Sequence, residues 1–435
     1  MPLPEQYRPI YKITIKNVES GEEYEYNSWY YKKDGKTHRS LNKLTIYVDR
    51  DLNVPLDLFR IRISSNSGKM LTEKGSLGLD ADNIKLGAAV KIYLGYAGEN
   101  ENDVKLDAPE NLVFTGLVDD VSQDLNNIVI TGYSNALKII FKKPEAFKDK
   151  QCADADSQAI VMALLGKVTS TQKPMVDVDE SFCEKGMTFY RFVPNIKESI
   201  YNNIKLLAEY NGFDLYFSRK GELRFCRKND RGPEIKYGEH ILENSISMTR
   251  PPFDEVSVVV CHTAKNADSH AWRLTSEPLE GANRIGTAKA EVLQRQSAII
   301  KDEKSAREAA KNKLARLYVP ETGSVTILGN PRLELGQGFD LDFTGAPDAL
   351  MYMDKQKVRI TRITHKFNMR SGFKTIVGWA RPQLSAKAPG FMGKVKPGQK
   401  IGESFSYGLE KDENYKEEEA KDFKPKLGRV LGPKV

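Results

Sequence analysis

The first third of the chain carries short runs in which hydrophobic and polar residues alternate, a pattern typical of half-buried β-strands. Strands are predicted over residues 41–48, 58–64, 84–96, 111–121 and 127–133. The first two are rich in β-branched residues and are bounded by polar turns. Several short strands at this spacing favour a small sandwich or barrel.

Helical spacing replaces this alternation after Lys142–Pro144. A helix is predicted over residues 154–165, where the apolar stripe consists of Ile160, Val161, Leu164 and Leu165. A second helix is predicted to begin at a capping box formed by Asn195 and Glu198 and to end at Asn211-Gly212. Strands 213–217 and 222–226 then flank a turn that contains Gly221, which predicts a hairpin and makes this middle region α+β.

Strand character returns at residues 256–261 and 288–300. A third helix is expected from a capping box at Ser305 and Glu308, with Val319-Pro320 closing it and with an apolar stripe of Ala306, Ala310, Leu314 and Leu317. Residues 323–380 have β character, whereas the sequence after Pro382 is rich in Lys, Glu, Gly and Pro. This last part is expected to be a tail or linker that a partner orders.

The two β-rich parts share a repeated pattern. Residues 84–95 align with residues 333–344, and each segment is followed by a loop, an alternating strand and a closing strand. In the second copy the alternation breaks parity between Ile360 and Ile363, which predicts a β-bulge near Thr361 or Arg362. The alternative interpretation is two unrelated β-domains that share a common turn before a strand.

Composition and charge narrow the class of protein. With 435 residues, 40% of them hydrophobic and 29% charged, the chain is long enough for two to four domains with real cores. The net charge of +7 is interleaved along the chain, which permits nucleic acid as a partner without indicating it. No run of about 18 apolar residues predicts a membrane span, and the N-terminus does not look like a signal peptide. Production in the cytoplasm is therefore expected.

Candidate chemistry is sparse. Cys152, Cys183, Cys226 and Cys261 are widely spaced, so free thiols are expected instead of a disulfide framework. The adjacent Cys261 and His262 point to opposite faces of a strand, and no spacing predicts a zinc site. His365 is interpreted as structural or interfacial. Asp119-Asp120 is interpreted as a solvated edge, since no nucleotide-binding loop or nucleophile elbow is present. No catalytic, cofactor-binding or metal-binding residue is predicted, and the chain is expected not to be an enzyme.

Basic residues near the end of the second β-rich part could form a nucleic-acid patch with neighbouring aromatic residues. The patch would comprise Arg359, Arg362, Lys366 and Arg370 with Phe367 and Phe373. A strand with a charged solvent face is the favoured interpretation, because no ribonucleoprotein-type motif accompanies these residues.

Several segments together resemble the phage late control gene D family. The strongest are residues 323–336, 358–367 and 372–379, and residues 114–118, 130–134 and 195–226 follow the same family order. Members of this family are the tail hub proteins of contractile tails, similar to the hub of T-even phage and to the N-terminal part of type VI valine-glycine repeat proteins. The resemblance covers roughly residues 40–382.

The resemblance implies a mainly β, α+β fold with two tube-like β-barrels, an inserted α+β domain and a C-terminal extension. The expected domains are a first barrel (1–141), the insertion (142–235), a second barrel with a helical insertion at about 302–318 (236–382) and a tail for spike docking or linking (383–435). It also implies a homotrimeric ring that adapts the sixfold inner tube to the threefold spike.

The expected partners follow from that role: a spike protein on a separate chain, the inner tube or a tube-initiator protein, and baseplate wedge proteins. DNA or an effector would pass through the bore, and the chain would end up in an assembled particle without inserting into a membrane. The alternative is a stand-alone β-barrel that binds nucleic acid or another partner. A baseplate-associated cell-wall hydrolase is disfavoured, because no carboxylate pair or catalytic cysteine stands in a suitable context.

Overall fold

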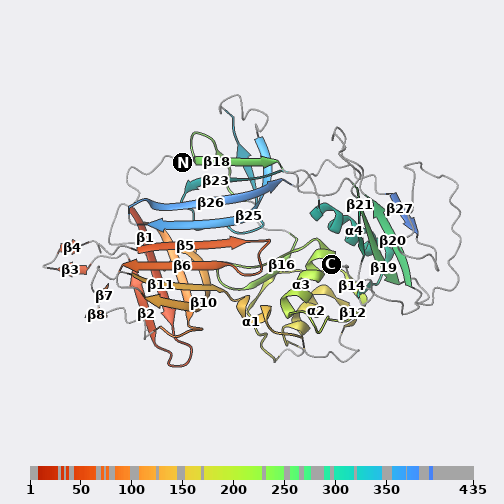
Figure 1. Ribbon diagram of the computed structural model, residues 1–435, viewed down its shortest axis with the longest axis horizontal. Coiled ribbons are helices and arrows are strands. Elements are labelled where there is room, and N and C mark those ends of the chain that lie inside the picture. Colours follow the sequence, from red (N-terminus) through yellow and green to blue (C-terminus); the bar gives the residue numbers. More distant parts are fainter. Residues whose placement is uncertain are drawn as a thin grey trace.

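The computed structural model describes residues 8–27, 31–33, 36–38, 44–64, 70–72, 75–77, 84–97, 107–123, 127–144, 152–167, 171–227, 232–248, 255–263, 269–275, 289–293, 298–317, 321–344, 355–368, 370–381 and 391–394. The fold is α+β and mainly β, as predicted, with its helices gathered beside the large sheet (Figure 1). Among the described residues, 13 strands belong to that sheet. Closure of its two parts into tubes remains a prediction.

One end of the large sheet is built by the N-terminal third of the chain, which we call the first β unit. Its strands run in the spatial order β5-β6-β11-β10-β9-β1-β2. Their bounds are β1 (Arg8–Lys16), β2 (Glu23–Asn27), β5 (Leu44–Asp51), β6 (Leu58–Ser64), β9 (Ala89–Ala97), β10 (Leu112–Gln123) and β11 (Asn127–Ser134). Two short hairpins, β3 (Tyr31–Lys33) with β4 (Lys36–His38) and β7 (Met70–Thr72) with β8 (Gly75–Leu77), and a 3-10 turn (Pro109–Asn111) complete it.

Alternation of side chains explains how this unit buries a core. Along β5 every second residue, beginning at Leu44, is buried, and the same period holds in β11. The buried side chains of β1, β5, β6, β9, β10 and β11 meet in one hydrophobic cluster. The expected strand over residues 58–64 coincides with β6.

The other end of the large sheet, the second β unit, comes mostly from the C-terminal part of the chain. Its spatial order is β18-β23-β26-β25-β24, and β17 pairs with β24. The bounds are β17 (Ile235–Lys236), β18 (Ile241–Met248), β23 (Glu321–Leu328), β24 (Gly338–Asp342), β25 (Lys355–Asn368) and β26 (Gly372–Arg381). A separate hydrophobic cluster around Trp379, Phe339 and Phe343 fills this unit.

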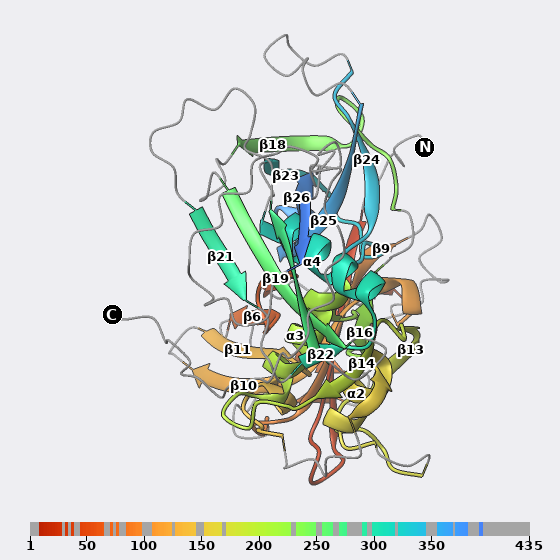
Figure 2. The same ribbon diagram turned by 90° about the vertical axis from the view of Figure 1, so that its right-hand side faces the viewer.

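The middle region packs its helices against small sheets. Its helices are α1 (Leu137–Ile140), α2 (Ser157–Leu164), α3 (Ile200–Asn211) and α4 (Glu303–Leu317). Its strands are β12 (Ala153–Asp156), β13 (Val178–Cys183), β14 (Thr188–Phe192), β15 (Asp214–Phe217), β16 (Leu223–Cys226), β19 (Glu255–Thr263), β20 (Ser269–Thr275), β21 (Lys289–Leu293), β22 (Ala298–Ile300) and β27 (Phe391–Lys394). Figure 1 shows β19, β20 and α4 at the opposite end of the molecule from β10 and β11, and Figure 2 looks onto β19 and β21 from that end.

Two predicted helix starts are corrected. Ser199, not Asn195, caps α3 by accepting a hydrogen bond from the Asn202 amide at 3.2 Å. The Asn195 side chain instead donates to Glu198 at 3.0 Å, in the turn before the helix. In α4 the cap is Asp302, which accepts from the Ser305 amide at 2.8 Å, so Ser305 lies inside the helix. The predicted hairpin around Gly221 is confirmed as β15 and β16.

Part of the range predicted for the second β unit packs elsewhere. Strands β19 and β22 and helix α4 contribute Val260, Ala298, Ile300 and Ala306 to the hydrophobic cluster of the middle region. The reason is visible in α4, whose alanine face is narrow enough to lie against α3 and β19. Within the predicted tail, β27 pairs with β20. The rest of residues 383–435 and the predicted closure at Val319-Pro320 lie outside the described residues.

Candidate functional site

The turn before β9 and the turn before β24 have the same conformation and the same hydrogen bonds. Gly87 and Gly336 adopt φ values of 79° and 75°, a region that favours glycine. The four equivalent hydrogen bonds, each from a backbone amide to a carbonyl oxygen, are Gly87 to Val118 (2.8 Å), Val118 to Ala88 (2.9 Å), Gly336 to Ile360 (2.9 Å) and Ile360 to Gln337 (2.9 Å). The predicted alignment of residues 84–95 with residues 333–344 is therefore confirmed at backbone level.

The equivalence extends over five strands. The order β5-β6-β11-β10-β9 of the first unit matches the order β18-β23-β26-β25-β24 of the second, and every pair is antiparallel. Both long strands carry a β-bulge at the same place: at Asp119 in β10 and at Thr361 in β25. The bulge predicted near Thr361 or Arg362 is thus confirmed, and its counterpart in β10 was missed. The two units are two copies of one structure within a single chain.

The two copies are joined edge to edge, and we call this contact the internal joint. Before its bulge, β25 pairs with β24 of its own unit, and after the bulge it pairs with β5 of the first unit, from Arg362 opposite Asp51 to Asn368 opposite Thr45. Figure 1 shows β25 and β5 side by side in the continuous sheet. The bulge bends β25, so the same edge of this strand pairs first with β24 and then with β5.

A cluster of polar side chains links β25 to β5 at the surface of the internal joint. The Arg362 guanidinium donates two hydrogen bonds to the Asp49 carboxylate, at 2.8 and 2.6 Å, and the Thr364 hydroxyl donates a third at 2.8 Å. Burial alone would raise the pKa of Asp49, but these hydrogen bonds hold it below its ordinary value. The pair adds cross-strand attraction to the backbone ladder.

Beneath the surface a buried ion pair connects all three regions. Arg50 of β5 pairs with Glu334 of the second unit, and both side chains are buried. The same guanidinium donates to the Phe217 carbonyl oxygen at 2.8 Å, while the Arg219 amide donates to Glu334 at 3.3 Å. Nearby, burial raises the pKa of Asp57 to about 7, although Arg50 opposes the rise. An uncompensated charge here would be costly, so the pair holds the three regions in one arrangement.

His365 lies under the internal joint and is structural, as expected. It is fully buried, its Nδ1 lies 3.0 Å from the Thr375 hydroxyl, and burial lowers its pKa to about 3. The ring is therefore neutral at ordinary pH and has no access to a substrate. His262 is also buried, whereas the neighbouring Cys261 side chain lies outside the described residues. Cys152, Cys183 and Cys226 are buried free thiols, and burial raises the pKa of each.

The two equivalent strands β10 and β25 carry the candidate acid pair and most of the candidate basic patch, respectively. Asp119 and Asp120 are both exposed, because the bulge at Asp119 interrupts the alternation that was expected to separate them. In the basic set, Arg359 pairs with Asp214 and Arg362 with Asp49. Phe367 and Phe373 are buried in the core of the first unit and cannot stack on bases. The six residues therefore do not form one nucleic-acid surface.

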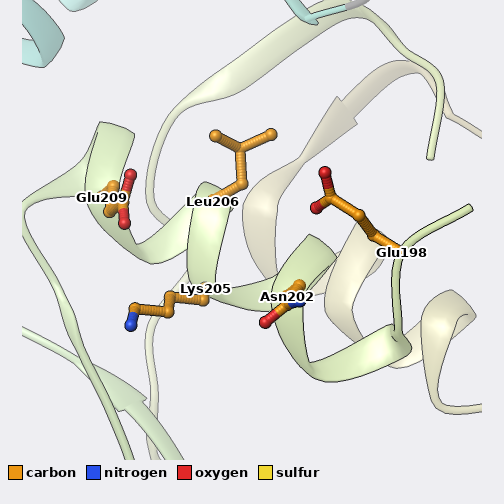
Figure 3. Close-up of a pocket in the computed structure, with 5 residues that line it drawn as sticks. All are labelled: Glu198, Asn202, Lys205, Leu206 and Glu209. Atoms are coloured by element: carbon orange, nitrogen blue, oxygen red, sulfur yellow. The ribbon is translucent and has the colours of Figure 1, made fainter. Parts of the chain in front are cut away.

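A hollow of about 260 Å³ lies along the outer face of α3. Glu198, Asn202, Lys205, Leu206 and Glu209 line it, and Figure 3 shows Glu198 on the turn before α3 and the others on the helix. Such a lining offers no nucleophile beside a base. Among the described residues no group of His, Cys, Asp and Glu is arranged to hold a metal ion, and no described helix is long and apolar enough to span a membrane.

Comparison with known proteins points to one fold. No family model matches the sequence, and no curated protein matches it. The chain is similar in structure to a tail protein from Neisseria meningitidis MC58, at 10% identity, 85% coverage of this chain, 96% of that chain and a TM-score of 0.54. It is equally similar to the 43 kDa tail protein of prophage MuSo2 from Shewanella oneidensis, at 14% identity, 86% and 98% coverage and a TM-score of 0.54. The chain has the fold of these tail proteins.

Proposed function

We propose that this chain is the structural hub of a contractile tail or injection-system baseplate, and that three copies form a ring. The observation that carries the proposal is the internal joint, in which one copy of a five-stranded unit extends the sheet of another by strand pairing. In a closed ring of chains that each carry two equivalent units, half of the contacts between neighbouring units lie within a chain and half lie between chains. Three chains would then present six similar units around one axis.

The arrangement suits a change of symmetry. A sixfold tube would find six similar surfaces on such a ring, while a threefold spike would find three identical chains. The tail-protein fold of both structural relatives supports this role. The domain ranges given above belong to the same proposal, except that β19, β22 and α4 pack with the middle region and β27 of the tail pairs with β20. The remainder of residues 383–435 would be available to the spike, and the tube, wedge and spike proteins are the proposed partners.

The role is mechanical and involves no bond making. The exposed residues of α3 offer no catalytic constellation, and the candidate histidine is sealed in the core. DNA or an effector would pass through the bore without tight phosphate contacts, which agrees with the use of Arg359 and Arg362 in ion pairs. The chain would be made in the cytoplasm and function within the assembled particle.

Mass photometry and negative-stain averaging of the full chain, alone and with its spike, test the proposal. The expected result is a closed ring of three protomers with six peripheral lobes. A chain that stays monomeric in both conditions and shifts the mobility of short DNA in a salt-dependent way would contradict the hub and support the stand-alone binding protein.

A further inference from the structure

The internal joint has two counterparts elsewhere in the chain whose edges carry no strand among the described residues. These are the part of β10 after its bulge, Asp119–Gln123, and the outer edge of β18. Resting on the proposed ring, we propose that the end of β10 in one protomer pairs antiparallel with β18 of the next, with Ser122 opposite Ser247. The partner is thus a second copy of this chain, bound head to tail.

Exposure distinguishes β18 from its buried counterpart. In β5, which β25 covers, residues alternate between buried and half-buried. In β18, at the equivalent place in the second unit, Leu242, Glu243, Asn244, Ser245 and Ser247 are exposed and Ile246 is half-buried. An open strand of this length is an aggregation hazard unless it is covered. Among the described residues, no strand covers β18 in the way that β25 covers β5.

The end of β10 shows the same contrast with β25. After the bulge in β25, Ile363, Thr364 and His365 are buried under β5. The equivalent residues after the bulge in β10 are Val121, Ser122 and Gln123, of which Val121 is half-buried and the others are exposed. β10 pairs with β9 only as far as Leu117, so its later backbone groups face outward on that side.

The internal joint also fixes the pairing register of the proposed contact. Thr364, the third residue after the bulge residue, lies opposite Asp49, and Asp49 lies opposite Leu58 of β6. The position equivalent to Asp49 in β18 is Ser247, which lies opposite Thr322 of β23. The third residue after the bulge residue Asp119 is Ser122. Applying the same geometry therefore places Ser122 opposite Ser247 and Gln123 opposite Ile246.

Side-chain chemistry at this register is compatible. In the internal joint the carboxylate of Asp49 accepts hydrogen bonds from Thr364 and Arg362. In the proposed joint the carboxylate would come from the other strand, because Asp120 occupies the position of Arg362 and Ser247 that of Asp49. The Ser247 hydroxyl can donate to Asp120, and no like charges face each other. In both views β18 lies above and β10 below the strands of the internal joint, so the two edges are on opposite sides of it, as a head-to-tail ring requires (Figures 1 and 2).

Paired cysteines test the register in the full-length protein. Ser122→Cys with Ser247→Cys joins the two proposed opposite positions, whereas Ser122→Cys with Ser245→Cys is the matched control, displaced by two residues on the same face of β18. Mild oxidation of the trimer should convert the first variant to covalent dimers and trimers on a non-reducing gel, about tenfold faster than the control. Wild type and the single variants should give no such ladder.

A charge exchange provides a test that does not rely on disulfide formation. Ser247→Asp would lie diagonally across the joint from Asp120, as Asp49 does from Arg362, and should raise the dissociation constant of the trimer by up to about fivefold per joint. Adding Asp120→Lys should restore it, because the double variant places across the ring the kind of pair that Arg362 and Asp49 form internally. A trimer that forms but shows neither the cross-link preference nor the rescue would overturn this register and leave the hub intact. Absence of any trimer would overturn both proposals.

Discussion

The two β units have the same strand order but carry a large buried aromatic side chain on opposite members of one equivalent strand pair. In the first unit, Phe59 of β6 lies opposite Gly132 of β11. In the second unit the equivalent pair is reversed, with Gly323 of β23 opposite Trp379 of β26. Each glycine leaves room for the aromatic ring, since an added Cβ would overlap with it. Each strand pair therefore has room for one large aromatic ring, and either of the two strands can carry it.

This exchange explains why the duplication is weak letter by letter and clear in the backbone. A residue-by-residue alignment compares Phe59 with Gly323 and Trp379 with Gly132, and scores both as mismatches. The conserved quantity is the volume shared by two facing positions, because cores tolerate substitution when total volume is kept. The bulge and the preceding glycine turn are better markers of the repeat, because they depend on backbone geometry.

Deleting the bulge residue should give the largest difference in effect between the two β units. Without Thr361, Ile360 would be followed directly by Arg362, so β25 would lose the extra residue that bends it away from β24 and toward β5, and the contact with β5 that covers Ile363 and Phe367 would be disrupted. We expect this variant to be insoluble or unfolded, as judged by circular dichroism and thermal unfolding. Deletion of Asp119 is the matched control, because mostly exposed residues follow it in β10. That variant should remain folded. Equal damage from both deletions would contradict the assignment of the internal joint to β25 alone.

Truncating the aromatic rings should give the next largest effect, and a similar one in both units. Trp379→Ala and Phe59→Ala each empty a fully buried site, so the free energy of unfolding should fall by about 3–5 kcal/mol. Urea denaturation measures this. The double variants Trp379→Ala/Gly323→Ala and Phe59→Ala/Gly132→Ala ask whether the opposite strand can refill the space. Loss of stability in only one unit would show that the exchanged pairs are not equivalent.

The smallest effects should come from two buried groups with opposite pH dependence. Asp57 holds its proton to about pH 7 in the folded chain, so it lowers stability as the pH rises from about 4 to 7. His365 stays neutral down to about pH 3, so it lowers stability as the pH falls below about 6.5. Near pH 7–8 the free energy of unfolding of Asp57→Asn should exceed that of wild type, whereas that of His365→Gln should differ least from wild type in this range. The expected differences are about 1–3 kcal/mol. Denaturation at several pH values checks both, and parallel curves for all three proteins would contradict this assignment.

Local structure was predictable where a single segment determines it. The alternation in residues 58–64 locates β6, the turn at Gly221 locates a hairpin, and the parity break after Ile360 locates a bulge. The bulge at Asp119 was missed because the residues around it are polar and exposed, so no apolar pattern breaks there. The starts of α3 and α4 were misplaced because several polar residues precede each helix and only the fold selects the capping one.

The candidate site itself could be predicted only in part. The repeat suggested two similar lateral surfaces, but nothing in the sequence identified Arg50 and Glu334 as partners, since a single charged residue on an alternating strand is usually solvated. Likewise, Arg362 looked like one member of a basic patch until the fold placed Asp49 beside it. Contacts between distant segments depend on the final pairing of β25 with β5, which no local pattern encodes.

The pairing of β25 with β5 also determines how long the edge of β5 stays unpaired during synthesis. Asp49 and Arg362 are separated by 313 residues, so β5 emerges from the ribosome long before the strand that covers it. At about 5–20 residues per second, the edge of β5 waits roughly 15–60 s for β25. During that interval a nascent neighbour on the same messenger could occupy the vacant edge. The charged side chains Asp49, Arg50 and Asp51 along β5 oppose such premature pairing and leave the edge for the chain's own C-terminal half.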